Sequence, residues 1–122
     1  MKWLGLASPG TRVSPAIASA SSQLGECIIV DVREPDELTT TGVAPGSVVV
    51  SLGDPEFEGK VAALSKQYRE KSIALMCRSG MRSVNASKRL HKHGVEDSQI
   101  IVGGMLAWEK LGLPLEAVPK DR

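Results

Sequence analysis

Aromatic residues are scarce in this sequence: one Phe, one Tyr and two Trp make up 3% of its 122 residues. Aliphatic side chains must therefore build the hydrophobic core, and the 42% hydrophobic content is enough for one. Cysteine is scarce too, with only Cys27 and Cys77. Two cysteines are too few for a disulfide scaffold, and neither lies in a pattern with zinc spacing. We therefore expect a reducing compartment and no metal site.

An excess of charge of one sign is also missing. The formal net charge is +1, which argues against nucleic acid as a partner and against an acidic interaction tail. No apolar run approaches the ~20 residues that cross a membrane, so no membrane partner is expected. The first ten residues lack the long apolar stretch of a signal peptide, and a cytoplasmic location is the expectation.

The chain length fits one compact domain. We expect an N-terminal arm at residues 1–12, the domain at residues 13–118 and a C-terminal tail at residues 119–122. Continuous apolar runs are typical of strands that are covered on both faces of a parallel sheet. Such runs lie at residues 27–32, 48–52, 72–77 and 100–102.

Helical patterns fall between these runs. Ser14 and Pro15 are typical of an N-cap and a first helical position, and the short helix after them should bury Ile17 and Leu24. Three further helices are predicted at residues 58–69, 82–92 and 107–111.

Two of these helices show a periodic apolar face. The periodicity places Val61, Leu64 and Tyr68 on one face of the first helix, and Ala86 and Leu90 together on one face of the second. Strands that alternate with helices predict an α/β domain with a mainly parallel central sheet and helices on both of its faces.

The most informative segment is Cys-Arg-Ser-Gly-Met-Arg-Ser at residues 77–83. It leaves a predicted strand and enters a predicted helix, and the carboxyl ends of strands are where ligands bind in open α/β sheets. A helix N-terminus presents unpaired N–H groups, and Gly80 permits a loop that directs more of them inward. Arg78 and Arg82 add positive charge, so the segment should favour a thiolate on Cys77.

A lone cysteine at a strand end has a simpler interpretation, because cysteine often serves as a small buried apolar residue. The surrounding arginines, the glycine and the helix start favour a reactive Cys77 over that interpretation.

Four segments in this order resemble the motifs of the rhodanese homology domain, and the resemblance covers about residues 13–115. Residues 29–34 resemble an early strand with an Asp-x-Arg signature, and residues 42–47 resemble a Gly-His-Ile-Pro-Gly-Ala turn, with Val-Ala in place of His-Ile. Residues 77–83 resemble the active-site loop, and residues 103–108 resemble a Gly-Gly-x-x-x-Trp motif.

The resemblance implies a role for each matching residue. Cys77 would be the catalytic nucleophile that carries sulfur as a persulfide. Asp31 and Arg33 would be structural, and Trp108 would pack the last helix onto the sheet. The substrate or the persulfide would be cradled by Arg78, Ser79, Gly80, Met81 and Arg82, the last of which would also help to hold the loop.

The activity that the resemblance implies is sulfur transfer in two half-reactions, from a donor such as thiosulfate to cyanide or a low-molecular-weight thiol. A thioredoxin-like or other sulfur-acceptor protein is a further candidate partner. No metal or organic cofactor is needed. Since Arg78 follows the nucleophile directly, we expect thiosulfate to be used better than mercaptopyruvate.

Two alternatives stay open. A phosphatase or arsenate reductase of the same fold would use a loop one residue longer than the four residues that separate Cys77 from Arg82. A sulfur carrier or regulatory module without enzymatic activity would look alike in sequence when its cysteine is intact.

The remaining candidate groups have simpler interpretations. Cys27 begins a predicted strand and is expected to be a buried apolar residue. His91 and His93 lie two residues apart, so they do not share a helix face, and they are expected to be solvated. Asp36 and Glu37 resemble an ordinary helix start.

Overall fold

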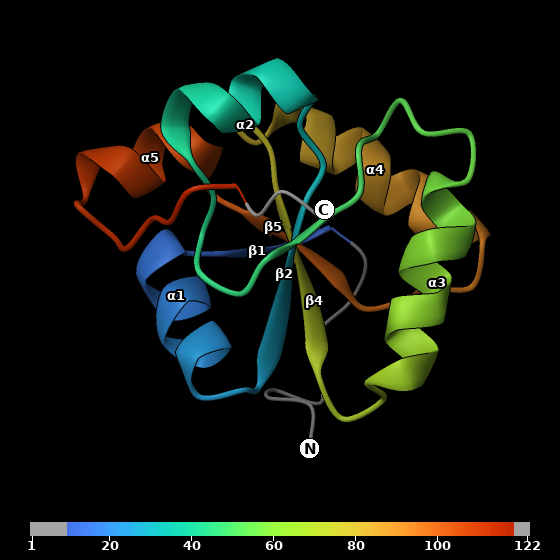
Figure 1. The fold of residues 1–122 in the computed structure, drawn as a ribbon. Helices are drawn as coiled ribbons and strands as arrows, with labels where there is room; N and C mark the ends of the chain where they lie inside the picture. The colour runs from blue at the N-terminus through green and yellow to red at the C-terminus, as the bar shows by residue number, and fades with distance from the viewer. Residues whose placement is uncertain (1–9, 119–122) are drawn as a thin grey trace.

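A computed structural model describes residues 10–118 of the chain. It contains one sheet of five parallel strands in the order β1-β5-β4-β2-β3, drawn at the centre of Figure 1. The strands are β1 (Thr11–Val13), β2 (Cys27–Asp31), β3 (Val48–Val49), β4 (Ser72–Met76) and β5 (Ser98–Ile101). The predicted α/β class with a parallel sheet is confirmed.

Helices cover both faces of the sheet, as expected. Figure 1 shows α1 and α5 on one side of the strands, α3 and α4 on the other, and α2 at the end where α4 begins. Their bounds are α1 (Pro15–Gln23), α2 (Pro35–Thr41), α3 (Phe57–Gln67), α4 (Met81–Lys92) and α5 (Gly104–Lys110). Within residues 10–118, none of these helices has the length and apolar character needed to cross a bilayer.

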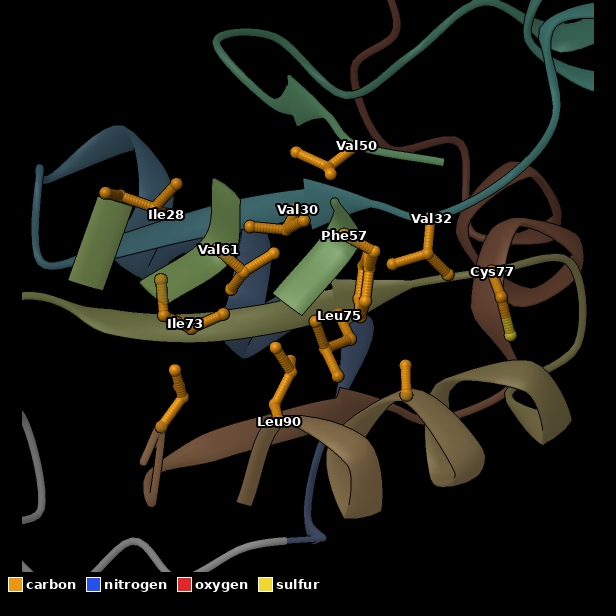
Figure 2. Close-up of a cluster of buried hydrophobic side chains, with 12 residues drawn as sticks. Ile28, Val30, Val32, Val50, Phe57, Val61, Ile73, Leu75, Cys77 and Leu90 are labelled. Atoms are coloured by element: carbon orange, nitrogen blue, oxygen red, sulfur yellow. The ribbon is translucent and has the colours of Figure 1, made fainter. Parts of the chain in front are cut away.

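Side chains that alternate along the strands divide the core into two halves. Odd-numbered residues of β2 such as Ile29 pack with Met105 and Trp108 under α1 and α5. Even-numbered residues such as Val30 pack with Val61 and Leu90 under α3 and α4. Figure 2 shows this second half, with Cys77 at one end of it.

Strand positions follow the apolar runs, but their ends differ. The run at residues 48–52 forms a strand only at Val48–Val49. The run at residues 100–102 belongs to a strand that begins earlier, at Ser98. Ser98 and Gln99 are fully buried, and their polarity hides the strand start from a hydrophobicity pattern.

The first strand was not predicted. Thr11 and Arg12, placed in the arm by the sequence, lie in β1 and pair with β5. The rest of that arm, residues 1–9, and the tail at 119–122 lie outside the described residues. A strand of three residues with one buried side chain carries too little pattern to be recognised.

The prediction for the first helix was right in its cap and wrong in its buried face. Ser14 Oγ accepts a hydrogen bond from Ile17 N at 3.1 Å, and Pro15 follows as the first helical residue. Ile17 is nevertheless 52% exposed and Leu24 74% exposed. The residues that face the sheet are smaller and include Ala18 and Ser19, so the helix packs through short side chains.

The predicted face of α3 does not extend to Tyr68. Helix α3 ends at Gln67, and Tyr68 leaves the helical conformation at its C-cap. Tyr68 is 37% exposed, and the centroid of its ring lies 5.0 Å from the Lys71 ammonium. The predicted face is confirmed at Val61, and Leu64 packs against the same core while partly buried.

The last two helices agree better with the sequence. Ala86 and Leu90 are fully buried in α4. Helix α5 begins three residues before its predicted start at 107, because two consecutive glycines open it. Trp108 is buried against the sheet, and its indole N–H donates to Pro114 O at 2.9 Å.

Candidate active site

Residues 77–80 form a loop that joins β4 to α4, and residues 81–83 are the first residues of that helix. Strand β4 ends at Met76 and α4 begins at Met81, so Cys77 is the first residue beyond the carboxyl end of the strand. The Cys77 side chain is 1% exposed and belongs to the core half under α3 and α4. The nucleophile proposed from the sequence is therefore enclosed by its loop rather than displayed on the surface.

Gly80 turns this loop back onto the sulfur. Its backbone adopts φ 105°, a left-handed conformation that favours glycine, and serves as the N-cap of α4. The Gly80 N–H donates to Cys77 Sγ at 3.0 Å. The first N–H groups of α4 have no carbonyl one turn earlier in the helix, so this end of α4 favours negative charge near the sulfur.

Helix α5 holds the loop from the opposite side. Met105 N donates to Cys77 O at 2.8 Å, and Leu106 N donates to Arg78 O at 3.0 Å. In a trans peptide the N–H points opposite to the C=O. The N–H groups of Arg78 and Ser79 therefore point away from α5, and the loop's donors are separated from its acceptors.

This contact explains the glycine at the first position of α5, Gly104. Gly104 has φ 55°, and a Cβ at this position would lie 2.7 Å from the carbonyl carbon and oxygen of Arg78. Only a residue without a side chain allows the helix to approach the loop so closely. The sequence motif at residues 103–108 is thus a docking surface for the backbone at Cys77.

Arg82 does not leave its charge free for a substrate. Its guanidinium donates to both carboxylate oxygens of Glu37, at 2.7 and 2.5 Å. Hydrogen bonding to Arg82 is the main reason that the pKa of Glu37 is lowered to about 2. The pair joins the start of α2 to the first turn of α4. Arg82 therefore holds the loop in place, and Glu37 neutralises the positive charge of Arg82.

Glu37 has more than the helix-start role that its position suggested. It lies in the first turn of α2, as the sequence indicated, and it also forms a capping box with Glu34. The further contact with Arg82 spans 45 residues, and no local pattern predicts it. Only the recognition that α2 and α4 begin at the same end of the sheet could have found this pair.

Asp31 and Arg33 form the polar network that was expected of them. Both are 1% exposed, and Arg33 Nη2 lies 2.8 Å from Asp31 Oδ2. Arg33 also donates to Thr41 Oγ1 at 2.8 Å and to Gly42 O at 3.0 Å. The buried pair therefore fixes α2, and with it Glu37, against the end of β2.

The other residues of the loop face outward. Arg78 and Ser79 are exposed, and Met81 is 78% exposed. Arg78 lines a pocket of about 210 Å³ between α2 and α5, together with Asp36 and Glu109. The structure thus places the Gly80 N–H on the sulfur and leaves these side chains at the surface.

Cys27 is a buried apolar residue, as predicted. It is 4% exposed in the core half under α1 and α5, on the face of the sheet opposite to Cys77. Burial raises the pKa of its thiol to about 12. His91 and His93 are exposed, and no group of three or more His, Cys, Asp or Glu residues in the described part of the chain is placed to hold a metal.

Comparison with known proteins agrees with this geometry. The model of the rhodanese-like domain matches residues 14–111. The chain is 41% identical over 85 residues to YtwF of Bacillus subtilis, a match that covers 69% of this chain and 75% of YtwF. It is 32% identical over 88 residues to the mitochondrial thiosulfate sulfurtransferase RDL2 of Saccharomyces cerevisiae, covering 66% of this chain and 59% of RDL2.

A solved structure shows the same fold. The crystal structure of a rhodanese-related protein from Thermoplasma volcanium superposes with a TM-score of 0.73 at 26% identity, covering 88% of this chain and 99% of that one. The match over most of the described residues, together with the loop that encloses Cys77, identifies the chain as a member of the rhodanese-like domain family.

Proposed function

We propose that the chain is an enzyme that moves sulfane sulfur from a donor such as thiosulfate to a thiophilic acceptor, cyanide or a thiol, through a persulfide on Cys77. The family and the sulfurtransferase names of its relatives support sulfur transfer in general. The observation that carries the finer proposal is the hydrogen bond of 3.0 Å from Gly80 N to Cys77 Sγ at the N-terminus of α4.

The first half-reaction loads the sulfur. The Cys77 thiolate attacks the outer sulfur of thiosulfate and forms a new S–S bond. The original S–S bond breaks, and its electron pair leaves with sulfite. Negative charge then rests on the outer sulfur of the persulfide, where the N–H donors of Gly80 and of the first turn of α4 favour it.

The second half-reaction returns the enzyme to its starting state. A cyanide ion or a thiolate attacks the outer sulfur of the persulfide. The bond between that sulfur and Sγ breaks, and its electron pair restores the Cys77 thiolate. Charge and atoms balance without a metal, a redox cofactor or an external oxidant.

Backbone groups supply most of the stabilisation in this proposal. Arg82 is neutralised by Glu37, whereas the exposed guanidinium of Arg78 has no ion pair within residues 10–118. Arg78 is therefore the cation that would attract an anionic donor to the mouth of the loop. Arg78→Ala should raise the KM for thiosulfate, and this effect should shrink as salt is added.

The decisive experiment is mass spectrometry after treatment with thiosulfate. We expect one added sulfur atom on Cys77 in the wild-type protein and in Cys27→Ser, and none in Cys77→Ser. Addition of cyanide should remove the sulfur and produce thiocyanate. A wild-type protein that gains no sulfur would contradict the proposal, and so would hydrolysis of an aryl phosphate at a rate comparable to that of sulfur transfer.

We further propose that the protein acts in a reducing compartment, the cytoplasm. The support is that both cysteines are free and lie on opposite faces of the sheet, so they are not placed to form a disulfide with each other. Fractionation followed by detection of the protein and of its thiol state would test this location.

A further inference from the structure

A groove opens between α2 and α5 beside the Cys77 loop. The two helices lie next to each other at the end of the sheet where the loop is found (Figure 1). The groove has a volume of about 210 Å³, and its lining includes Met105 and Arg78. Met105 N donates to Cys77 O at 2.8 Å, so this groove lies directly behind the peptide of the nucleophile.

The groove carries acidic charge that the fold does not use. Asp36 and Glu109 line it and are exposed, and neither carboxylate has an ion pair within residues 10–118. Glu37 also lines it, but its charge is matched by Arg82. Two unpaired carboxylates against the single unpaired cation of Arg78 make the groove complementary to a basic side chain.

Exposed apolar side chains surround the same loop. Leu106 lines the groove and is 48% exposed, and its N–H binds Arg78 O at 3.0 Å. Met81 is 78% exposed and Val102 44% exposed. Met81 follows Gly80 and Val102 precedes Gly103, two glycines that lie close together, since a Cβ on Gly80 would be 3.6 Å from Gly103 N. A small anionic donor gains little from such side chains, whereas burial against a protein surface is favourable.

We propose that the α2–α5 groove and these apolar side chains form the docking surface for a sulfur-acceptor protein. Its reactive cysteine would lie on a segment that also carries a lysine or arginine, whose stem packs on Leu106 and whose charge meets Asp36 and Glu109. This inference rests on the proposed function and specifies its second substrate. The partner thiolate attacks the outer sulfur of the persulfide, the bond to Sγ breaks, and the electron pair returns to Cys77.

Single-turnover transfer tests the surface separately from the chemistry. The protein is loaded with thiosulfate, freed of excess donor, and mixed with one of three acceptors. These are 2-mercaptoethanol, a short peptide with Lys and Leu beside its cysteine, and the same peptide with Glu in place of Lys. At low salt we expect the Lys peptide to accept sulfur roughly fivefold faster than the Glu peptide, as two exposed charge pairs would allow.

Variants locate the effect. The double variant Asp36→Asn/Glu109→Gln should remove the preference for the Lys peptide and leave transfer to 2-mercaptoethanol unchanged. The matched control is Glu26→Gln/Glu96→Gln, which alters two exposed carboxylates at the opposite end of the strands and should keep the preference. Leu106→Ser should slow both peptides, whereas Leu24→Ser, at a residue that is 74% exposed on another surface, should slow neither.

Equal rates for the two peptides would overturn the docking surface and leave the proposed function standing. The docking surface would also be overturned if the Glu26→Gln/Glu96→Gln control reduced the preference for the Lys peptide as much as Asp36→Asn/Glu109→Gln does. Failure of thiosulfate to load Cys77 would overturn the proposed function, and the inference with it.

Discussion

The guanidinium of Arg82 donates two hydrogen bonds, of 2.7 and 2.5 Å, to the two carboxylate oxygens of Glu37. The two side chains are 25% and 36% exposed, so the pair is partly shielded from water. It joins α2 to the first turn of α4, directly beyond the loop that encloses Cys77. The position of that first turn therefore depends on a residue far away in the sequence.

Glu37→Gln should lower kcat for sulfur transfer by about tenfold, because Arg82 is no longer held and the loop that it anchors is less well oriented. The KM for thiosulfate should fall or stay constant, since the positive charge of Arg82 is then uncancelled. Steady-state kinetics would separate the two parameters, and Glu37→Asp should recover part of kcat.

The matched control for this variant is Glu58→Gln. Glu58 of α3 pairs with Arg89 of α4 at 2.9 Å, with side-chain exposures of 25% and 35%, away from the loop. Its kcat should stay within about twofold of wild type. A similar kcat loss in both variants would show that Glu37 acts only through general stability.

The same pair predicts how stability depends on pH. The pKa of Glu37 is lowered from 4.5 to about 2, so its contribution is fully present above pH 4.5 and is lost as pH falls through 2. The free energy of unfolding of the wild type should exceed that of Glu37→Gln by at most about 1 kcal/mol at neutral pH. Urea titrations at decreasing pH should show this difference disappearing, and a difference that grows in acid would contradict the assignment.

Gly104→Ala should reduce both stability and sulfur transfer. The new Cβ would meet the Arg78 carbonyl at 2.7 Å in addition to the strain of a left-handed backbone, and a loss of about 3 kcal/mol or more is expected. Gly112→Ala is the control, because Gly112 has φ 68° and open space at its Cβ. It should lose about 1 kcal/mol and keep its activity. Equal losses in thermal or chemical unfolding would mean that the close approach to Arg78 has no cost.

Arg33→Met should destabilise the protein by about 3–5 kcal/mol, because it leaves the buried carboxylate of Asp31 without its partner. The double variant Asp31→Asn/Arg33→Met should be less destabilised than the sum of its two single variants. Chemical denaturation of all four proteins completes the cycle. Simple additivity would show that the two side chains contribute independently.

Cys27 should resist alkylation in the folded protein, because burial raises the pKa of its thiol to about 12. The clean test is the Cys77→Ser variant treated with iodoacetamide near neutral pH, with and without urea. Mass spectrometry should find no label in the native protein and one label after unfolding. Labelling of the native variant would show that the strand around Cys27 opens readily.

The order of strands and helices could be predicted because buried parallel strands are apolar throughout. Residues of β2 and β4 are all buried, and their continuous apolar runs predict both strands. The run of β5 was only half recognised because Ser98 and Gln99 are polar yet fully buried. Ile17 was expected to be buried because hydrophobic helix residues usually face the sheet, but α1 packs on the sheet through smaller side chains and Ile17 faces solvent.

The loop around Cys77 could be located from the sequence because its residues are contiguous, and the structure adds the partners that are not. Glu37 and Gly104 reach the loop from α2 and α5, across 45 and 27 residues from Arg82 and Cys77. Such contacts depend on topology, which places the ends of several elements at one edge of the sheet. A local pattern contains no information about them.

The contact of α5 with the backbone at Cys77 also has a consequence for the order of events during synthesis. A ribosome adds Cys77 well before it adds Gly104, which packs against the loop backbone, and Met105, whose N–H binds the carbonyl of Cys77. A nascent chain that ends before residue 103 therefore holds the complete sequence of the loop without the helix that orients it. The final shape of the loop is therefore a late product of translation, and the sulfur transfer that we propose for Cys77 should begin only after the last helix has docked.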